Sequence, residues 1–312
     1  MSDKTGKERI HDTSREPRKQ EHPSTYIVQD RENRREMLRL AIQDQMITSG
    51  MGGVLPEQPN PTVFQRVLDV ACGTGGWAIE AARNYPAMSV AGIDISQQMI
   101  EYARGLAADQ QVNDRVEFHV MDALRILEFP DRFFDLVNLR FGVSFLRTWD
   151  WPKMLSELLR VTRPGGIVRV TDEEIVHPGS SPAISRSFQE EMLQRALYQA
   201  GHLFADKTTG LTDHLERLLI QHGCLQVQTK AHALVFRAGT PEWQAYYGDV
   251  EHAFQTIRPF LQKWAGSGAT REYDAIRQRI QEEMQQPDFH ATWNLLTVWG
   301  VRPDTIESEQ VH

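Results

Sequence analysis

Three aspartates stand where short apolar segments of the sequence end. They are Asp69, Asp94 and Asp122, and the segments are 67–71, 89–93 and 116–120. Ligands of open α/β sheets bind beyond the carboxyl ends of the strands. If these segments are parallel strands of one sheet, the three carboxylates lie along one edge of it. We therefore expect them to face a common ligand.

A glycine turn beside the first aspartate indicates the chemistry of that ligand. Gly73 and Gly75 follow Asp69 where the first strand turns into a helix, and glycine lets the backbone approach a ligand closely. The spacing is not G-x-G-x-x-G, and a carboxylate at this position would repel a diphosphate. It would instead attract an ammonium group, while Asp94 can accept hydrogen bonds from both ribose hydroxyls. The pattern favours an adenosine joined to an amino acid, as in S-adenosylmethionine.

Five segments between about residues 66 and 172 resemble elements of a known family in that family's order. They are Val67–Trp77, Val90–Met99, Val116–Ala123, Phe134–Arg140 and Leu159–Gly166. The first resembles motif I, D/E-x-G-x-G-x-G, of the class I (Rossmann-like) S-adenosylmethionine-dependent methyltransferases, with Ala71 in place of the first glycine. The alternative interpretation is that the chain has another α/β fold in which three acids lie at strand ends by chance. The resemblance is nearest to ubiquinone-biosynthesis-type small-molecule methyltransferases and covers the core only.

This resemblance implies S-adenosyl-L-methionine as cofactor, S-adenosyl-L-homocysteine as product, and no metal. In the family, the acid after the third strand meets the adenine amino group and the next backbone N–H meets a ring nitrogen; here these are Asp122 and Ala123. Met99 corresponds to the apolar residue that packs on the adenine. The end of the fourth strand lies under the methionine part. The cofactor-binding residues implied are Asp69, Ala71, Gly73, Thr74, Gly75, Asp94, Ile95, Met99, Asp122, Ala123, Asn138, Leu139 and Arg140.

Alternating strand and helix patterns after residue 66 predict a parallel sheet covered on both faces. We expect an α/β fold with a seven-stranded, mostly parallel, doubly wound sheet of the class I methyltransferase type and helical cap insertions. Core helices are expected at 76–84, 97–109 and 151–162, and strands at 67–71, 89–93, 116–120, 134–139, 167–171, 225–236 and 291–301. The last strand is expected to be antiparallel and to lie at the edge.

The segments around this core are expected to form a lid and a cap. A helix from Asp30 to Thr48 should end at a group of glycines, which could serve as a hinge; the alternative is a helix that only covers the sheet. The predicted division is a disordered tail 1–24, a lid helix 25–55, the core 56–177, a first cap insertion 178–208, core again 209–239, a second helical cap 240–288, the final strand 289–303 and a tail 304–312. The aromatic residues of 241–286 are either the wall of an apolar acceptor pocket or the core of a helical subdomain.

Methyl transfer is an in-line displacement at the sulfonium carbon, so the protein contributes mainly alignment and exclusion of water. A base is needed only if the acceptor must lose a proton. The candidate catalytic residues are Glu173, His177 and Arg140, which lie at or after the ends of the fourth and fifth strands. The alternative is that these side chains are solvated or form structural pairs. Of Glu173 and Glu174, strand alternation should send only one inward.

Composition limits the partners of the chain. The 312 residues carry a formal net charge of −8, which disfavours nucleic acid as a partner. No run of 18 apolar residues is present, so no membrane span is expected. Cys72 and Cys224 have no metal-ligand spacing, and a cytoplasmic location is the default. We expect a monomer or homodimer acting on a small methyl acceptor.

The predicted function is S-adenosylmethionine-dependent transfer of a methyl group to O, N or C of a small, largely apolar acceptor. One alternative is a partner or regulatory protein that binds S-adenosylmethionine without transferase activity. Another is a protein or RNA methyltransferase. A nucleotide-dependent oxidoreductase is disfavoured by the spacing of the glycines.

Overall fold

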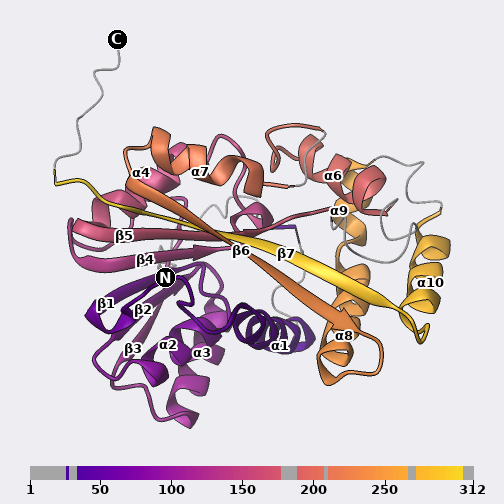
Figure 1. Cartoon of the computed structure of the whole chain (residues 1–312), viewed down its shortest axis with the longest axis horizontal. Coiled ribbons are helices and arrows are strands. Elements are labelled where there is room, and N and C mark those ends of the chain that lie inside the picture. Colours follow the sequence, from indigo (N-terminus) through magenta and orange to yellow (C-terminus); the bar gives the residue numbers. More distant parts are fainter. Residues whose placement is uncertain (1–25, 28–33, 177–187, 207–209, 266–271, 305–312) are drawn as a thin grey trace, which may run out of the picture.

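Seven strands form one sheet in the order β3–β2–β1–β4–β5–β7–β6 (Figure 1). The computed structural model describes residues 26–27, 34–176, 188–206, 210–265 and 272–304. The strands are β1 (Arg66–Val70), β2 (Ser89–Asp94), β3 (Val116–Val120), β4 (Phe134–Arg140), β5 (Thr162–Glu173), β6 (Leu225–Arg237) and β7 (His290–Val301). Strands β1 to β5 pair in parallel. The predicted seven-stranded α/β fold is confirmed.

The position of β7 in the sheet differs from the prediction. Strand β7 is antiparallel, but it lies between β5 and β6 and pairs with both. Every residue of β7 is buried or half-buried, whereas one face of β6 is largely exposed. A strand covered on both faces is stable inside a sheet, and a strand with a polar face can form its edge. The prediction that the last strand forms the edge was therefore wrong, and β6 occupies that place.

Helices cover both faces of the sheet. The core helices are α2 (Gly76–Asn84), α3 (Gln97–Asp109), α4 (Trp151–Val161) and α7 (Thr212–Gln221). Apolar residues of α2 and α3 pack with Val67 and Leu136 in one buried cluster. Those of α4 and α7 pack with Leu68 and Val137 in another. Because successive strand residues point to opposite faces, these clusters lie on the two sides of the sheet.

The lid helix α1 (Arg34–Met51) ends later than predicted. It continues through Gly50 and stops where Gly52 and Gly53 adopt φ angles of +90° and +115°, a region that glycine enters without steric cost. The predicted start at Asp30 lies outside the described residues, as does the tail 1–24. A short 3₁₀ turn, η1 (Pro61–Val63), leads into β1.

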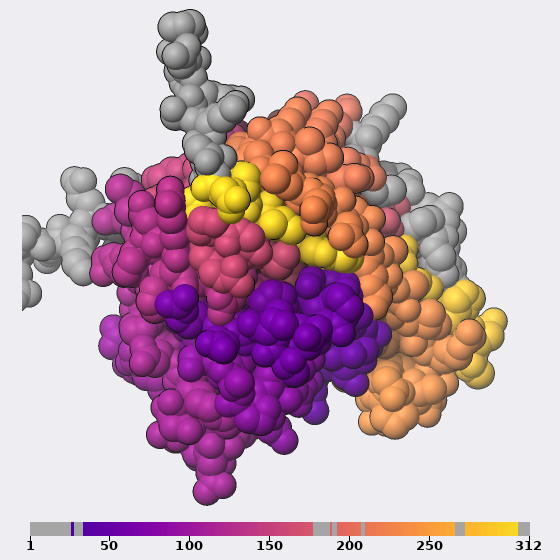
Figure 2. Space-filling model, turned by 60° about the vertical axis from the view of Figure 1, so that its left-hand side comes forward, coloured from indigo at the N-terminus to yellow at the C-terminus, as the bar shows by residue number. Residues whose placement is uncertain are grey.

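The remaining helices gather at one end of the sheet, at the right of Figure 1. They are η3, a π-helical turn (Phe188–Leu193), α6 (Gln194–Gln199), α8 (Pro241–Thr256), α9 (Arg258–Trp264) and α10 (Tyr273–Met284). Helix α1 packs against α8 and β6 there. Figure 2 shows the indigo N-terminal helix set against the orange residues of the cap. Segments far apart in the sequence thus meet beyond the carboxyl ends of the parallel strands.

Candidate active site

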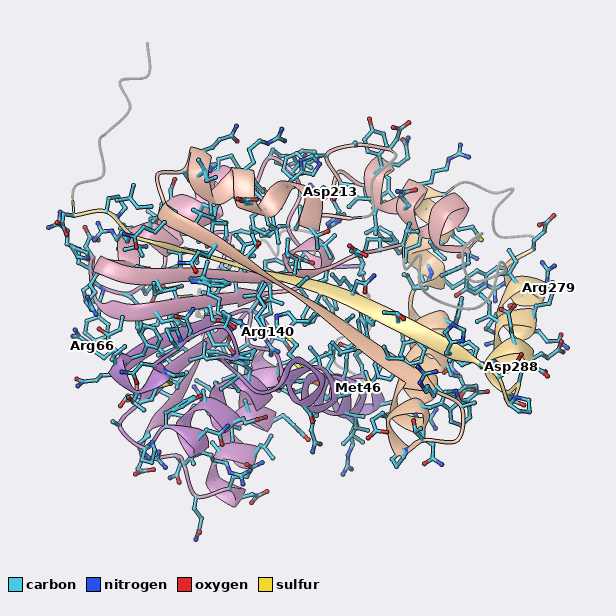
Figure 3. All side chains as sticks on the ribbon, viewed as in Figure 1. Met46, Arg66, Arg140, Asp213, Arg279 and Asp288 are labelled. Atoms are coloured by element: carbon cyan, nitrogen blue, oxygen red, sulfur yellow. The ribbon has the colours of Figure 1, made fainter. Side chains whose placement is uncertain are left out.

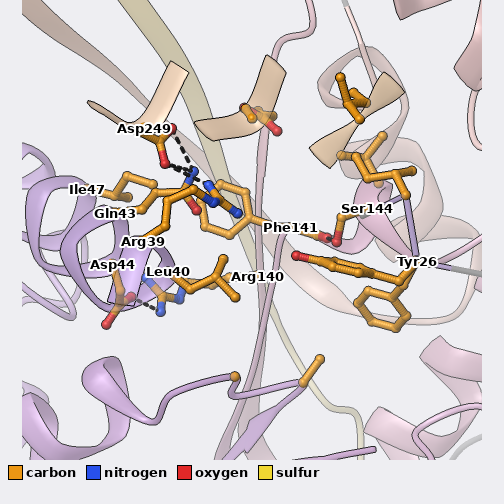
Figure 4. Close-up of a pocket in the computed structure, with 18 of the residues that line it drawn as sticks. Tyr26, Arg39, Leu40, Gln43, Asp44, Ile47, Arg140, Phe141, Ser144 and Asp249 are labelled. Carbon is orange, nitrogen blue, oxygen red and sulfur yellow. Dashed lines mark hydrogen bonds and ion pairs between the residues drawn. The ribbon is translucent and has the colours of Figure 1, made fainter. Parts of the chain in front are cut away.

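A cavity of about 720 Å³ lies between the carboxyl ends of the parallel strands and the helices α1, η3, α6, α8 and α10. Figure 4 shows part of its wall, with residues of α1, β4 and α8 pointing into one space. Its volume is in the range of small-molecule sites. We distinguish two regions of this cavity. The first region is bordered by the predicted strand-end aspartates, and the second region is bordered by the cap helices.

All three predicted aspartates border the cavity. Asp94 accepts hydrogen bonds from the backbone N–H of Gly73 (3.1 Å) and of Ser96 (2.8 Å). Asp122 accepts one from Leu124 N (2.9 Å) and lies 3.3 Å from Arg125 Nε. Backbone donors thus fix the orientation of both carboxylates at the cavity wall.

Asp69 is the most buried of the three, with a relative exposure of 2%. Its Oδ1 accepts a hydrogen bond from Asn138 Nδ2 (2.8 Å), and its Oδ2 has no hydrogen-bond partner among the described residues. Burial raises its pKa to about 6, although Arg140 and Asn138 favour the charged form. A buried carboxylate oxygen without a donor is costly in the free protein, and a cationic ligand group would relieve that cost.

The glycines of the turn have different physical roles. Both have positive φ angles, +53° for Gly73 and +75° for Gly75. A Cβ on Gly73 would meet nothing within 4 Å, so its side faces open space. A Cβ on Gly75 would lie 2.5 Å from Phe118 Cζ, so this position is closed by core packing. Ala71 also has a positive φ, +56°, where the family motif has glycine.

Most of the other predicted cofactor residues also border the cavity: Ala71, Gly73, Thr74, Ile95, Met99, Ala123 and Arg140. Gly75, Asn138 and Leu139 do not belong to its lining; Asn138 and Leu139 are fully buried behind it. Asn138 reaches the cavity only through its hydrogen bond to Asp69. These three positions therefore shape the wall without facing the space.

Arg140 connects the core to the lid helix. Its guanidinium pairs with Asp44 of α1 and lies 3.4 Å from Thr48 Oγ1. Figure 3 places Arg140 near the middle of the molecule, close to α1. The next residue, Phe141, has a φ of +57°, which is unusual for a bulky side chain and a sign of local strain. Both residues border the cavity.

Glu173 is the predicted base that the structure places in the second region of the cavity. Its Oε2 accepts a hydrogen bond from Trp293 Nε1 (2.6 Å). Burial raises its pKa to about 8, and the neighbouring Asp172 adds to the shift. Asp172 faces the backbone and accepts from Val143 N and Glu173 N (both 3.0 Å), at the 3₁₀ turn η2 (Gly142–Ser144).

Glu174 also borders the cavity and accepts a hydrogen bond from Asn294 Nδ2 (2.9 Å). Glu174 and Asn294 also line a second pocket that Glu173 does not border, whereas Trp293, the partner of Glu173, borders the first cavity. The two glutamate side chains thus bond to alternate residues of β7, which agrees with the prediction that strand alternation sends only one of them inward. His177, the other candidate base, lies outside the described residues.

A polar network joins α1 to α8 where these two helices cover the cavity, which we call its roof. The sequence analysis did not predict this network. Arg39 Nη1 donates to Asp249 Oδ1 (2.6 Å), and Gln43 Nε2 donates to both oxygens of Asp249 (3.1 Å). Arg39 also pairs with the fully buried Glu36 (2.7 Å). The dashed lines in Figure 4 mark the contacts at Asp249. Asp249 lies more than 200 residues from Arg39 and Gln43, so the sequence held no local signal for the contact between the two helices.

The second region is otherwise mainly apolar. Tyr246 stacks on Phe236 with ring centroids 4.4 Å apart, and Phe188 packs on Phe254 at 4.7 Å. Further lining residues are Ile27, Leu40, Ile47, Phe145, Ile175, Leu193, Leu197, Val250, Ile257, Ile280, Met284, Phe289 and Trp293. The aromatic residues of the cap are thus both cavity wall and helical core, and the two predicted interpretations overlap.

Cys72 borders the cavity, and burial raises the pKa of its thiol well above the ordinary value. A thiol of this kind is a poor nucleophile. Within the described residues, no group of three or more His, Cys, Asp or Glu side chains is arranged to hold a metal ion.

Comparison with known proteins agrees with this geometry. Residues 67–166 match the family model described as a methyltransferase domain. The matched range covers β1 to β4, α2 to α4 and the start of β5, including the strand-end aspartates. Residues 67–166 are thus similar to a methyltransferase domain.

The methyltransferase domain has relatives among curated proteins. A demethylmenaquinone methyltransferase of Deinococcus radiodurans is 37% identical over 131 residues, or 42% of this chain and 52% of that protein. The ubiquinone/menaquinone biosynthesis C-methyltransferase of Geobacter sulfurreducens is 38% identical over 102 residues, or 32% of this chain and 39% of that protein. The chain thus spans about half or less of the relatives it matches. The predicted nearness to ubiquinone-type methyltransferases is confirmed.

Among solved structures, phosphoethanolamine N-methyltransferase 2 of Haemonchus contortus in complex with S-adenosyl-L-methionine has a TM-score of 0.48. It is 22% identical, and the alignment covers 82% of this chain and 52% of that one. Among the described helices, none is long and apolar enough to cross a membrane.

Proposed function

We propose that the chain is an S-adenosylmethionine-dependent methyltransferase acting on a small, largely apolar acceptor. The observation that carries the proposal is the single cavity that runs from the strand-end aspartates to the apolar region under α8. A donor bound at the first region and an acceptor bound at the second would share one cavity. Such an arrangement suits group transfer between two bound molecules.

The residues of the first region fit S-adenosylmethionine. The partnerless Oδ2 of buried Asp69 suits an ammonium group, and open space beside Gly73 suits close approach of the amino-acid part. Asp94 would accept from the ribose hydroxyls, and Met99 would pack on the adenine, with Asp122 at its amino group. In this proposal Gly75, Asn138 and Leu139 support the wall from behind.

When bound, S-adenosylmethionine supplies a methyl group on a positively charged sulfur, so the leaving group needs no further activation. The chain's own residues align the acceptor and exclude water. The roof pair Arg39–Asp249 and the tether Arg140–Asp44 hold the lid helix over the cavity. We propose that the segments 25–55, 178–208 and 240–288 act together as the lid and cap.

Glu173 is the residue we propose as the base for an acceptor hydroxyl or amine. Its carboxyl group borders the acceptor region, and the Trp293 N–H fixes its orientation. With a pKa of about 8 the carboxyl is mostly protonated at pH 7, so it would act as a base in the ionised fraction, which grows as the pH rises toward 8. We assign Arg140 to positioning, because its guanidinium is already engaged by Asp44.

The acceptor class is supported by the relatives, whose names state demethylmenaquinone and ubiquinone/menaquinone biosynthesis. A ring system of that kind suits the aromatic wall formed by Phe188, Tyr246 and Phe254. The net charge of −8 supports a partner other than nucleic acid. We further propose a cytoplasmic monomer or homodimer.

The test is calorimetric titration of S-adenosylmethionine into the full chain, followed by methyl transfer to a panel of hydroxyquinones, phenols and amines. We expect binding by wild type and at least about 10-fold weaker binding by Asp69→Asn, because the ammonium loses a charged acceptor. Absence of binding by the wild-type protein would overturn the proposal. Tight binding with no transfer to any acceptor would favour the non-catalytic alternative.

A further inference from the structure

Three polar side chains stand next to one another on adjacent strands behind the cavity wall. Asp69 of β1 is in register with Asn138 of β4, and Asn138 is in register with Arg169 of β5. Asn138 Nδ2 donates to Asp69 Oδ1 (2.8 Å), and Arg169 Nη1 donates to Asn138 Oδ1 (2.7 Å). The row runs across three strands and ends at the carboxylate that borders the cavity.

A carboxylate outside the sheet completes the row. Arg169 Nε donates to Glu57 Oε1 (2.8 Å) and Nη2 donates to Oε2 (3.3 Å). Both side chains are fully buried. Although burial opposes it, the Arg169 guanidinium holds the pKa of Glu57 below its ordinary value. The far end of the row is therefore a charged, hydrogen-bonded pair.

The segment that carries Glu57 is itself fixed. Trp77 Nε1 donates to Val54 O (3.0 Å), and Lys230 Nζ donates to Pro56 O (2.7 Å). Glu57 follows the lid helix and its terminal glycines by only a few residues. The row thus joins the start of the core, just after the lid, to the cofactor end of the cavity.

A fully buried ion pair is a poor source of stability, because the desolvation of both charges offsets their attraction. Here the geometry gives it another role. The guanidinium fixes which end of the Asn138 amide faces Asp69, since Oδ1 accepts from Arg169 and only Nδ2 is left to donate. With Oδ1 of Asp69 engaged in this way, its Oδ2 is left for the ligand.

We propose that Glu57, Arg169 and Asn138 are positioning residues that hold the Asp69 carboxylate for the ammonium group of the cofactor. The inference rests on the proposed function. It adds Glu57 and Arg169 and gives Asn138 a defined role, and none of the three borders the cavity. Asn138 acts directly on Asp69, and the buried pair acts through Asn138.

Two variants test the row. Asn138→Ala removes the donor to Asp69, and the double variant Arg169→Gln/Glu57→Gln replaces the buried ion pair by neutral amides of similar size. The second variant leaves no buried charge unpaired, which protects the fold. The matched control is Arg163→Gln, since Arg163 of β5 pairs with Asp135 of β4 (2.6 Å) at the other end of the same two strands.

The measurement compares two ligands that differ in the amino-acid part. S-adenosylhomocysteine carries the ammonium, and 5′-methylthioadenosine lacks the whole amino acid. We expect both row variants to weaken binding of the first by about 10-fold and of the second by less than about 2-fold. Arg163→Gln should change neither. Equal losses for both ligands would show a merely structural role and overturn the inference.

A ligand-free readout separates this inference from the proposed function. A ¹³C NMR titration of the Asp69 carboxyl in the free protein should show a higher pKa in Asn138→Ala than in wild type, because the Asn138 hydrogen bond favours the charged form. An unchanged titration would overturn the positioning role. If wild type binds no S-adenosylhomocysteine while the titration shifts, the proposed function fails and the row still acts on Asp69.

Discussion

Two carboxyl groups in the cavity have raised pKa values, and burial is the main cause for both. Asp69 titrates at about 6 and Glu173 at about 8. Asp69 lies near Arg140, which favours its charged form, whereas Glu173 lies beside Asp172, which disfavours it. The environments therefore separate a group charged at neutral pH from one that exchanges a proton there.

The titration of Asp69 predicts how cofactor binding depends on pH. The ionised carboxylate attracts the ammonium and the neutral acid does not, so affinity should fall as the pH drops through about 6. Below that point we expect a loss approaching about 10-fold per pH unit. Calorimetric titrations with S-adenosylhomocysteine between pH 5 and 8 measure it. Affinity that stays flat over this range would exclude Asp69 as the ammonium partner.

The titration of Glu173 predicts a gain in stability and a loss of rate for Glu173→Gln. Its folded pKa of about 8 lies above the unfolded value, so the wild-type protein loses stability as the pH rises between the two values. The Gln variant lacks this loss and should be more stable at pH 8 by at least about 2 kcal/mol, with no difference near pH 4.

With a hydroxyl or amine acceptor, the same variant should lose at least about 100-fold in kcat. Urea unfolding at several pH values and steady-state rates measure the two effects. The control is Glu242→Gln, an exposed change on α8. A stability difference that does not depend on pH, or full activity of Glu173→Gln, would contradict the assignment.

At the scale of elements, the lid is held by contacts between α1 and α8 more than by its own sequence pattern. Arg39, Gln43 and Asp249 connect the two helices across the roof of the cavity. Arg140 connects α1 to the end of β4 through Asp44. If α1 is the lid that we propose, its opening would have to break these contacts, and we expect the network to influence how readily ligands enter and leave.

Removal of Asp249 tests this connection. Asp249→Ala leaves Arg39 with only Glu36 and leaves Gln43 without its acceptor, which should cost about 2–4 kcal/mol in the free energy of unfolding. Release of S-adenosylhomocysteine in stopped flow should become several-fold faster as the lid opens more often. Glu242→Ala, exposed on the same helix, is the control. Unchanged release by Asp249→Ala would mean that α1 and α8 do not gate the cavity.

At the scale of the whole molecule, the cavity is built from parts of the chain that sequence order separates. The core supplies one wall, and the lid and cap supply the others. A ligand that fills this space contacts most of the chain's elements. Its binding should therefore stabilise the folded molecule as a unit.

Thermal unfolding measures that effect. S-adenosylmethionine at 100 times its dissociation constant should stabilise the protein by about 2.7 kcal/mol and raise the Tm by roughly 5 °C. NADH at the same concentration should leave the Tm unchanged, because Asp69 repels its diphosphate. A shift produced by NADH and absent with S-adenosylmethionine would favour the oxidoreductase alternative.

The core could be predicted from the sequence because its signals are local. Helices α2 and α3 and strand β3 begin and end at the predicted residues, since strand hydrophobicity, glycine turns and helix periodicity act over a few neighbours. The three strand-end aspartates followed from the same patterns. Asn138 was among the predicted cofactor residues, but its pairing with Arg169 of the next strand was not predicted.

The rest was decided by tertiary structure. Strand β7 lies inside the sheet because it can bury both of its faces, whereas β6 cannot. This order depends on the packing of β5, β6 and β7 against one another and not on any one segment of the sequence. The roof network and the buried row join residues that lie far apart in the chain. The sequence by itself determined the kind of cofactor that the strand ends suit. Only folding brought the lid and cap over them, because burial and long-range hydrogen bonds, rather than local pattern, fix that arrangement.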